Sequence, residues 1–132
     1  MELNLTVGLT GEKREQVTEE KTAIRYGSGS VAVYATPAMV GLMEGAAMDA
    51  VADRLPEGMS TVGTELKIKH TAATPVGMAV RATAELVEVD GRRLVFAVKA
   101  FDEKEEIGAG THERFVVKVD KFLAKAEGKK VG

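Results

Sequence analysis

Hydrophobic residues recur at helical spacing in one clear stretch, between Thr36 and Arg54. The apolar positions three and four residues apart are Met39, Leu42, Met43, Ala46, Ala47, Ala50 and Val51. The Thr36-Pro37 pair is typical of an N-cap followed by a first-turn proline. Pro56 and Gly58 end the pattern. The spacing therefore predicts one long helix of apolar and small residues, buried on most of its sides.

After this helix the hydrophobic period changes to two. Alternation runs through four segments, "TELKIKH", "VRATAELVEV", "LVFAVKAF" and "THERFVVKVD". Asp90-Gly91 is a strong turn signal between the second and third segments, and a turn around residues 103–106 follows the third. The pattern predicts four consecutive strands joined largely by hairpins, an antiparallel meander.

The chain before the helix is polar, with β-branched residues interspersed. Lys13–Ile24, "KREQVTEEKTAI", predicts an exposed edge strand, and Gly27–Ser30, "GSGS", a flexible connector. The final residues, "KAEGKKVG", predict a solvated tail. The resulting order is one strand, one helix and four antiparallel strands. This is an α+β plan in which one helix covers a face of a five-stranded sheet.

Length and composition limit the class of protein. The 132 residues, 45% hydrophobic and 29% charged, fit a single globular domain over residues 1–132. The formal charge of −2 argues against a nucleic-acid-binding surface. No window approaches the length of a membrane span, and the N-terminus lacks the pattern of a signal peptide. With zero cysteines, disulfides are excluded and a cytoplasmic location is expected.

Glu44 is a carboxylate among small and apolar neighbours on the predicted helix. Val40 and Met48 lie one turn to either side of it. It either reaches solvent at the helix edge or lies desolvated in a cleft. In a cleft it needs a partner or its pKa rises, and it could act as a base or nucleophile.

Two further residues could take part in chemistry. Thr36 would cap the helix, yet the helix N-terminus also offers N–H groups to a developing oxyanion. His70 ends the "TELKIKH" strand before the small residues of "TAATPVG", which leave its imidazole room to face a cleft. The alternative is a histidine bonded to the backbone at a strand end. His112, the other histidine, fits a structural or surface role, and two separated histidines without cysteine predict no metal site.

Three segments carry a resemblance to a known family: "VYATPAMVGLMEGAA", "VGTELKIKHTAATPVG" and "IGAGTHERFVVKVDKF". They resemble the fluoroacetyl-CoA thioesterase group of the hotdog thioesterases over about residues 33–125. The resemblance implies a hotdog fold, with a curled sheet around a central helix, and pairing into a homodimer or higher homo-oligomer. It also implies hydrolysis of an acyl-CoA, with no cofactor.

The resemblance assigns site residues one by one. A threonine opening the helix, a glutamate eight positions later and a histidine in "HTAATP" form the catalytic set of that family, which implies this role for Thr36, Glu44 and His70. The glycine of "GT" and the arginine of "GTHER" contact substrate there, which implies that role for Gly63 and Arg114.

One region departs from the family pattern. The fluoroacetyl-specific enzyme has an aromatic-containing lid before the helix, where this chain has "YGSGSVAVY". Pro37 and Ala38 replace a glycine and a bulkier residue. We therefore expect a plain short-chain acyl-CoA as the substrate. A non-catalytic acyl-CoA-binding domain is the main alternative, but such a domain would not need the intact set of Thr36, Glu44 and His70. A hydratase or dehydratase of the same fold is a third possibility.

The spacing of Thr36 and Glu44 restricts how they share a site. Eight helical residues separate the two by roughly 12 Å, too far for direct contact. Either the chain near Thr36 leaves regular helix, or residues of two subunits meet. The dimer implied by the resemblance favours the second, with Glu44 approaching Thr36 or His70 of its partner. The sequence leaves open whether Glu44 attacks the thioester or activates water.

Overall fold

The apolar spacing after Thr36 produces a single long helix, α2, which spans Thr36–Val51 and continues into a 3-10 turn, Ala52–Arg54. A computed structural model describes residues 3–131, so the expected domain of residues 1–132 is described except at its extreme ends. The buried face of α2 consists of Ala38, Met39, Leu42, Met43, Ala46, Ala47, Ala50 and Val51. Gly41 and Met48 lie on the opposite, exposed side. The helix is therefore buried along one broad face, less completely than expected.

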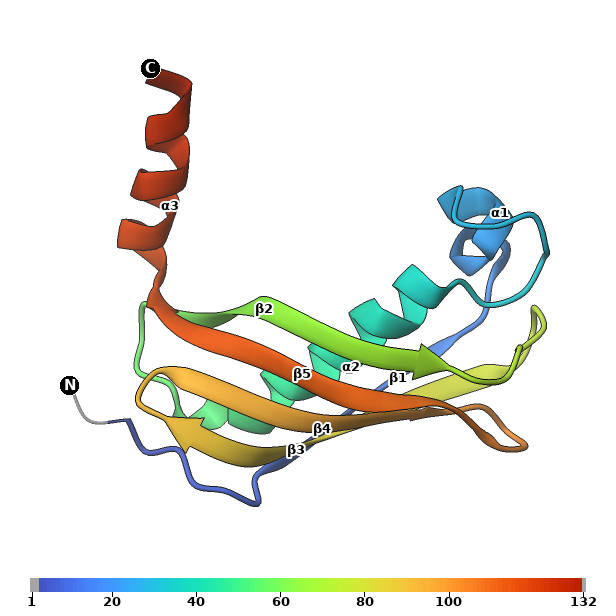
Figure 1. Ribbon diagram of the computed structural model, residues 1–132, viewed down its shortest axis with the longest axis horizontal. Coiled ribbons are helices and arrows are strands. Elements are labelled where there is room, and N and C mark those ends of the chain that lie inside the picture. Colours follow the sequence, from blue (N-terminus) through green and yellow to red (C-terminus); the bar gives the residue numbers. More distant parts are fainter. Residues whose placement is uncertain (1–2, 132) are drawn as a thin grey trace.

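Five antiparallel strands form one sheet that curls around α2 (Figure 1). The strands are β1 (Thr10–Gln16), β2 (Met59–His70), β3 (Ala79–Asp90), β4 (Arg93–Phe101) and β5 (Glu106–Lys118). Their order in the sheet is β1-β3-β4-β5-β2. The predicted α+β architecture is confirmed.

The predicted meander is only partly correct. Strands β3, β4 and β5 follow one another as hairpins, but β2 pairs with β5 and not with β3. The segment between His70 and Ala79 crosses the fold, where Val33 forms a bridge with Pro75 and the Tyr34 N–H donates to the Thr74 carbonyl. This crossing leaves β2 at one edge of the sheet and β1 at the other.

The turn between β3 and β4 lies at the predicted place. Asp90 pairs with Arg93, so Gly91 and Arg92 form the turn. Gly91 has a φ of 60°, a left-handed conformation that glycine adopts without strain.

The first strand is shorter than expected. β1 forms the predicted edge, but it ends at Gln16, and the rest of the expected strand becomes a 3-10 turn, Glu19–Lys21, and a short helix, α1, Ala23–Tyr26. The Thr22 hydroxyl donates to the Glu19 carbonyl and accepts from the Arg25 N–H. These bonds favour a helical turn over an extended chain. Figure 1 shows α1 near the start of α2.

The C-terminal tail is exposed, as expected, but it is helical. Helix α3, Val119–Glu127, follows β5 directly and stands away from the sheet (Figure 1). Asp120 lies in its first turn and Lys125 in its last, the charge arrangement that the helix dipole favours. No α3 residue is buried, although Val119, Phe122 and Leu123 follow helical spacing; these side chains are exposed.

Glycine allows the sheet to approach α2 closely. A Cβ atom at Gly11 on β1 would lie 2.9 Å from the Ala50 Cα on the helix, too close for any side chain. The backbone of β1 therefore packs directly on the backbone of α2. Within residues 3–131, no helix is long and apolar enough to cross a membrane.

Candidate active site

Thr36 and His70 meet at the end of the fold where α2 begins and β2 ends. The Thr36 Oγ1 lies 2.8 Å from the His70 Nδ1. The predicted capping role of Thr36 was wrong, because Ala35 is the N-cap residue and no side chain caps the helix. Since its hydroxyl is not engaged by the helix backbone, Thr36 is free to pair with the imidazole.

A shallow pocket of about 270 Å³ opens beside this pair. Its lining comes from α1 and the following loop, the start of α2, and the segment after β2: Ala23, Ser28, Val33, Tyr34, Thr36, His70, Thr71, Ala72 and Ala73. Most of these side chains are small. The expectation that His70 faces a cleft among the small residues of "TAATPVG" agrees with this lining.

Burial lowers the pKa of His70 below its usual range, and a backbone interaction with Ala72 opposes this only in part. The imidazole is therefore neutral near neutral pH and able to accept a proton. Its Nε2 is buried and has no hydrogen-bond partner of good geometry among the described residues. A single hydroxyl contact thus holds the ring, through Nδ1.

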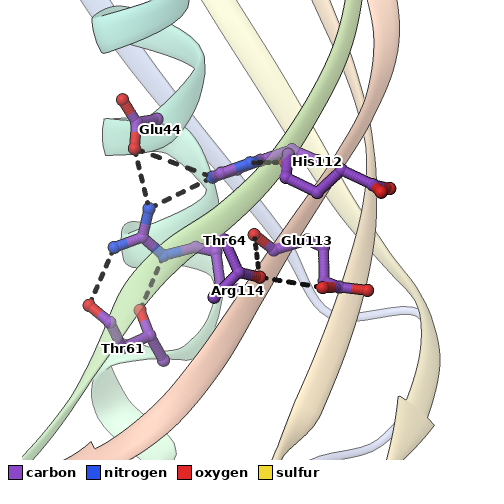
Figure 2. A network of polar contacts seen from close by, with 7 residues as sticks. Glu44, Thr61, Thr64, His112, Glu113 and Arg114 are labelled. Atoms are coloured by element: carbon purple, nitrogen blue, oxygen red, sulfur yellow. Dashed lines mark hydrogen bonds and ion pairs between the residues drawn. The ribbon is translucent and has the colours of Figure 1, made fainter.

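Glu44 lies on α2 beside the inner face of the sheet, where it finds a charged partner (Figure 2). Its Oε2 accepts from the Arg114 Nη1 at 3.3 Å. The Glu44 side chain is 36% exposed, whereas the Arg114 side chain is only 5% exposed. The carboxylate is consequently fixed on one side and reachable on the other.

Arg114 is held in place by β2 as well as by Glu44. Its Nε donates to the Thr61 Oγ1 and its Nη2 to the Thr61 carbonyl, both at 2.8 Å. Burial lowers the pKa of Arg114, while Glu44 raises it. An arginine remains charged despite such a shift, so the buried guanidinium places a positive charge beside the Glu44 carboxylate.

Gly63 lies against the same carboxylate. A Cβ atom at this position would lie 2.7 Å from the Glu44 Oε2. The absence of a side chain on β2 therefore leaves the space that the carboxylate occupies. Gly63 and Arg114 were expected to contact substrate; in this structure both contact or adjoin Glu44, and a substrate contact stays a prediction.

The two groups of site residues are separate within one chain. Helix α2 is regular from Thr36 onward, which excludes an irregular start as the way to bring Thr36 and Glu44 together. Glu44 adjoins Gly63, whereas His70 lies seven residues further along β2, roughly 23 Å at the usual strand rise. A single chain thus pairs Thr36 with His70 and keeps Glu44 at a distance.

Sequence reasoning missed Thr61 and did not place His112 in this site. The period-two pattern of "THERFVV" contains the relevant signal, because it places His112, Arg114 and Val116 on one face of β5. All three are buried. Two polar residues at successive inward positions indicate a buried polar network. The surface alternative for His112 is excluded by this burial, which favours the structural one.

Metal ligation has no support in the described part of the chain. No group of three or more histidine, cysteine, aspartate or glutamate residues in it could hold a metal ion.

Comparison with known proteins places these residues in a family context. Residues 17–120 match the family model described as fluoroacetyl-CoA-specific thioesterase. The fluoroacetyl-CoA thioesterase of Streptantibioticus cattleyicolor is 52% identical over 97 residues, which cover 74% of this chain and 70% of that protein.

Solved structures agree with this match. A threonine-to-serine variant of the fluoroacetyl-CoA thioesterase FlK, in complex with acetyl-CoA, is 42% identical with a TM-score of 0.90, covering 95% of this chain and 98% of the other. A hot-dog-like protein from Thermanaerovibrio acidaminovorans is 26% identical with a TM-score of 0.84, covering 97% and 94%. The curled sheet around α2 is the hotdog fold.

Proposed function

Because the chain belongs to the fluoroacetyl-CoA-specific thioesterase family, we propose that it hydrolyses a short-chain acyl-CoA to a carboxylate and free CoA. The observation that carries this proposal is the Thr36–His70 hydrogen bond beside an open pocket. It supplies a hydroxyl to position substrate or water and a neutral imidazole to accept a proton. A domain that only binds acyl-CoA would not need this pair.

The reaction adds water to the thioester carbonyl and expels the CoA thiolate. In the first step the carbonyl oxygen becomes an oxyanion, which N–H donors stabilise. The N-terminal end of α2 at Thr36 and the backbone of Gly63 are the candidates for these donors. In the second step the C–S bond breaks, and the proton released by the attacking water passes through His70 to the departing thiolate. An ordinary thiol has a pKa of about 8.5, so this leaving group needs little assistance.

Glu44 can serve in either of two ways. As a general base it removes a proton from the attacking water, which then forms the new C–O bond. As a nucleophile its carboxylate oxygen attacks the carbonyl, and water hydrolyses the resulting anhydride. Arg114 supports both roles, because its hydrogen bond holds the carboxylate in one orientation.

We propose that a complete site forms between two subunits. Strand β2 is an edge strand, and residues 63–67 along it are exposed, including the apolar Leu66. Antiparallel pairing of β2 with the same strand of a second copy, centred near Leu66, would bring the partner subunit's His70 close to Gly63. Glu44, which adjoins Gly63, would then face the Thr36–His70 pair of the other chain.

We expect the pocket to accept plain acyl groups without selecting fluorinated ones. The segment "YGSGSVAVY" before α2 has aromatic residues only at its two ends, Tyr26 and Tyr34, and apart from Tyr34 and His70 the pocket is lined by small side chains. Acetyl- and propionyl-CoA are therefore the expected substrates, with no strong preference for fluoroacetyl-CoA. The chain has no cysteine, so we place its activity in the cytoplasm, without nucleic acid or membrane as partner.

The experiment is a screen of free-thiol release from acetyl-, propionyl-, longer acyl- and fluoroacetyl-CoA, with Glu44→Gln as the matched inactive control. Release from short acyl-CoA esters by the wild-type protein, but not by the control, supports the proposal. Binding of acyl-CoA by folded protein without thiol release would favour the binding domain instead. A specificity constant several orders of magnitude higher for fluoroacetyl-CoA would overturn the substrate assignment.

A further inference from the structure

His112 is a buried histidine that the proposed reaction does not use. It lies on β5 two residues before Arg114, and its exposed fraction is 1%. The groups around it come from three other elements: the Glu65 carbonyl on β2, Glu44 on α2, and the Phe96 ring on β4 with its centroid at 6.4 Å. The charged groups that face its ring are Arg114 and Glu44.

The two hydrogen bonds of His112 determine its tautomer. Nδ1 lies 2.9 Å from the Glu65 carbonyl oxygen, which can only accept, so Nδ1 carries the proton. Nε2 lies 3.1 Å from the Arg114 Nη1, which can only donate, so Nε2 presents its lone pair. The ring is therefore neutral and protonated at Nδ1.

The neutral, Nδ1-protonated His112 explains why the Arg114 guanidinium points toward Glu44. Thr61 accepts from Nε and Nη2, and His112 accepts from Nη1, which also donates to Glu44. With the two Thr61 contacts on one side and His112 on the other, the remaining Nη1 proton is directed at the Glu44 Oε2 (Figure 2).

We propose that His112 is a positioning residue, which in its neutral Nδ1-protonated form orients Arg114 and, through it, the Glu44 carboxylate. The proposal rests on the proposed thioesterase function, in which Glu44 is the reacting carboxylate. Protonation of Nε2 would remove the acceptor for Arg114 and set two cations side by side. Nε2 would then turn to Glu44, whose Oε2 is 4.0 Å away. The Glu44 carboxylate would then lose Arg114 as its partner, gain His112, and move.

Burial lowers the pKa of His112, as does Arg114, while the Glu65 carbonyl and Glu44 oppose this shift. The neutral form is thus the one present at neutral pH. Acidification below the ordinary histidine range would be needed to protonate Nε2 and turn His112 toward Glu44.

Two near-isosteric substitutions separate the two ends of the ring. Asparagine can keep the donor to the Glu65 carbonyl but has no atom at the place of Nε2. Glutamine can place a carbonyl oxygen near Nε2 and gives up the donor at Nδ1. We expect His112→Asn to lower kcat by about 10- to 100-fold with little change in KM, as a misplaced reacting group does. We expect His112→Gln to stay within about threefold of wild type.

Each variant loses one buried hydrogen bond, so thermal unfolding should shift both to a similar extent. A role in stability alone would therefore reduce activity equally in both, and that result would overturn the proposal. A second check places His112→Asn on the Arg114→Lys background. If His112 acts through Arg114, the second substitution should add little further loss, whereas a fully multiplicative loss would contradict it.

Nitrogen NMR of the ¹⁵N-histidine-labelled protein tests the tautomer without any activity. We expect a protonated Nδ1 and an unprotonated Nε2 for His112 at neutral pH. A proton on Nε2 at that pH would overturn the proposal. This measurement also separates the two hypotheses: absence of thiol release by the wild type would refute the proposed function, while the tautomer would still decide whether His112 orients Arg114.

Discussion

The hydroxyl of Thr36 lies 2.8 Å from the Nδ1 of His70, although 34 residues separate them. The contact joins the first turn of α2 to the last residue of β2. The threonine hydroxyl is available for it because Ala35, and not Thr36, is the N-cap residue and no side chain caps the helix. The pair is the part of the proposed site that one chain completes by itself.

Removal of the Thr36 hydroxyl should affect activity far more than stability. We expect Thr36→Val to lower kcat/KM by about 10²-fold, the scale of a lost proton-transfer or positioning group. Thr36→Ser retains the hydroxyl and should keep most of the activity. Because Thr36 is exposed and caps nothing, both unfolding free energies should stay within about 0.5 kcal/mol of wild type. Full activity in Thr36→Val would remove the residue from the mechanism.

A methyl group at Gly63 should displace the Glu44 carboxylate. The added Cβ would lie 2.7 Å from Oε2, at the flexible end of the glutamate side chain, so the carboxylate can move away at little cost to folding. We expect Gly63→Ala to reduce kcat by about 10²-fold and to lower the free energy of unfolding by less than about 1 kcal/mol.

Gly128→Ala is the matched control for this substitution. It adds the same methyl group where no atom lies within 4 Å and φ is −59°. Steady-state kinetics and urea unfolding of both variants provide the comparison. Equal activity in the two proteins would show that Glu44 does not need the space beside Gly63.

The free energy of unfolding should fall as the pH drops below about 6.5, the ordinary histidine pKa. Burial lowers the pKa values of both His70 and His112 in the folded chain. In this window the unfolded state therefore binds more protons than the folded state, and acidification favours unfolding.

Urea unfolding between pH 7.5 and 5.5 measures this effect above the range in which ordinary carboxyl groups titrate. His70→Gln and His112→Gln should each reduce the slope of stability against pH. A wild-type stability that is constant across the window would contradict the neutral state of both rings. Activity should persist to lower pH than an ordinary histidine would allow, because burial lowers the pKa of His70 in the folded chain.

Mixed subunits test whether Glu44 and His70 act across an interface. We expect inactive Glu44→Ala and His70→Ala proteins to regain activity when exchanged into heterodimers, because one of the two sites then has both wild-type groups. If both groups belonged to the same chain's site, each mixed site would lack one of them. Heterodimers verified by mass spectrometry that stay silent would reject the shared site.

The local elements of this fold could be predicted because they depend on near neighbours. The spacing of apolar residues identified α2, and alternation identified β3, β4 and β5 with the turn at Gly91. The pairing of β2 with β5 could not be predicted, since alternation identifies a strand but not its neighbour in the sheet. Helix α3 was missed because its first residues, Val119 and Asp120, continue the alternation of "THERFVVKVD", although Val119, Phe122 and Leu123 follow helical spacing.

The residues of the candidate site could likewise be predicted only in part. Glu44 could be singled out because a carboxylate on an apolar helix needs a partner. That the partner is Arg114, 70 residues away, depends on the curl of the sheet and left no trace in local spacing. Thr36 illustrates the opposite error: its sequence context favoured a cap, and the tertiary contact with His70 prevailed.

The backbone contact between β1 and α2 has a consequence for how this enzyme can diversify. No side chain fits at Gly11 without moving the α2 backbone, and Ala46 and Ala50 beside it are buried, so we expect larger residues there to destabilise the fold. Positions around the pocket, such as Ser28 and Val33, carry no such restriction. Substitutions that change the preferred acyl chain, in nature or in a laboratory library, should therefore occur in the loop before α2. The contact between β1 and α2 should stay unchanged.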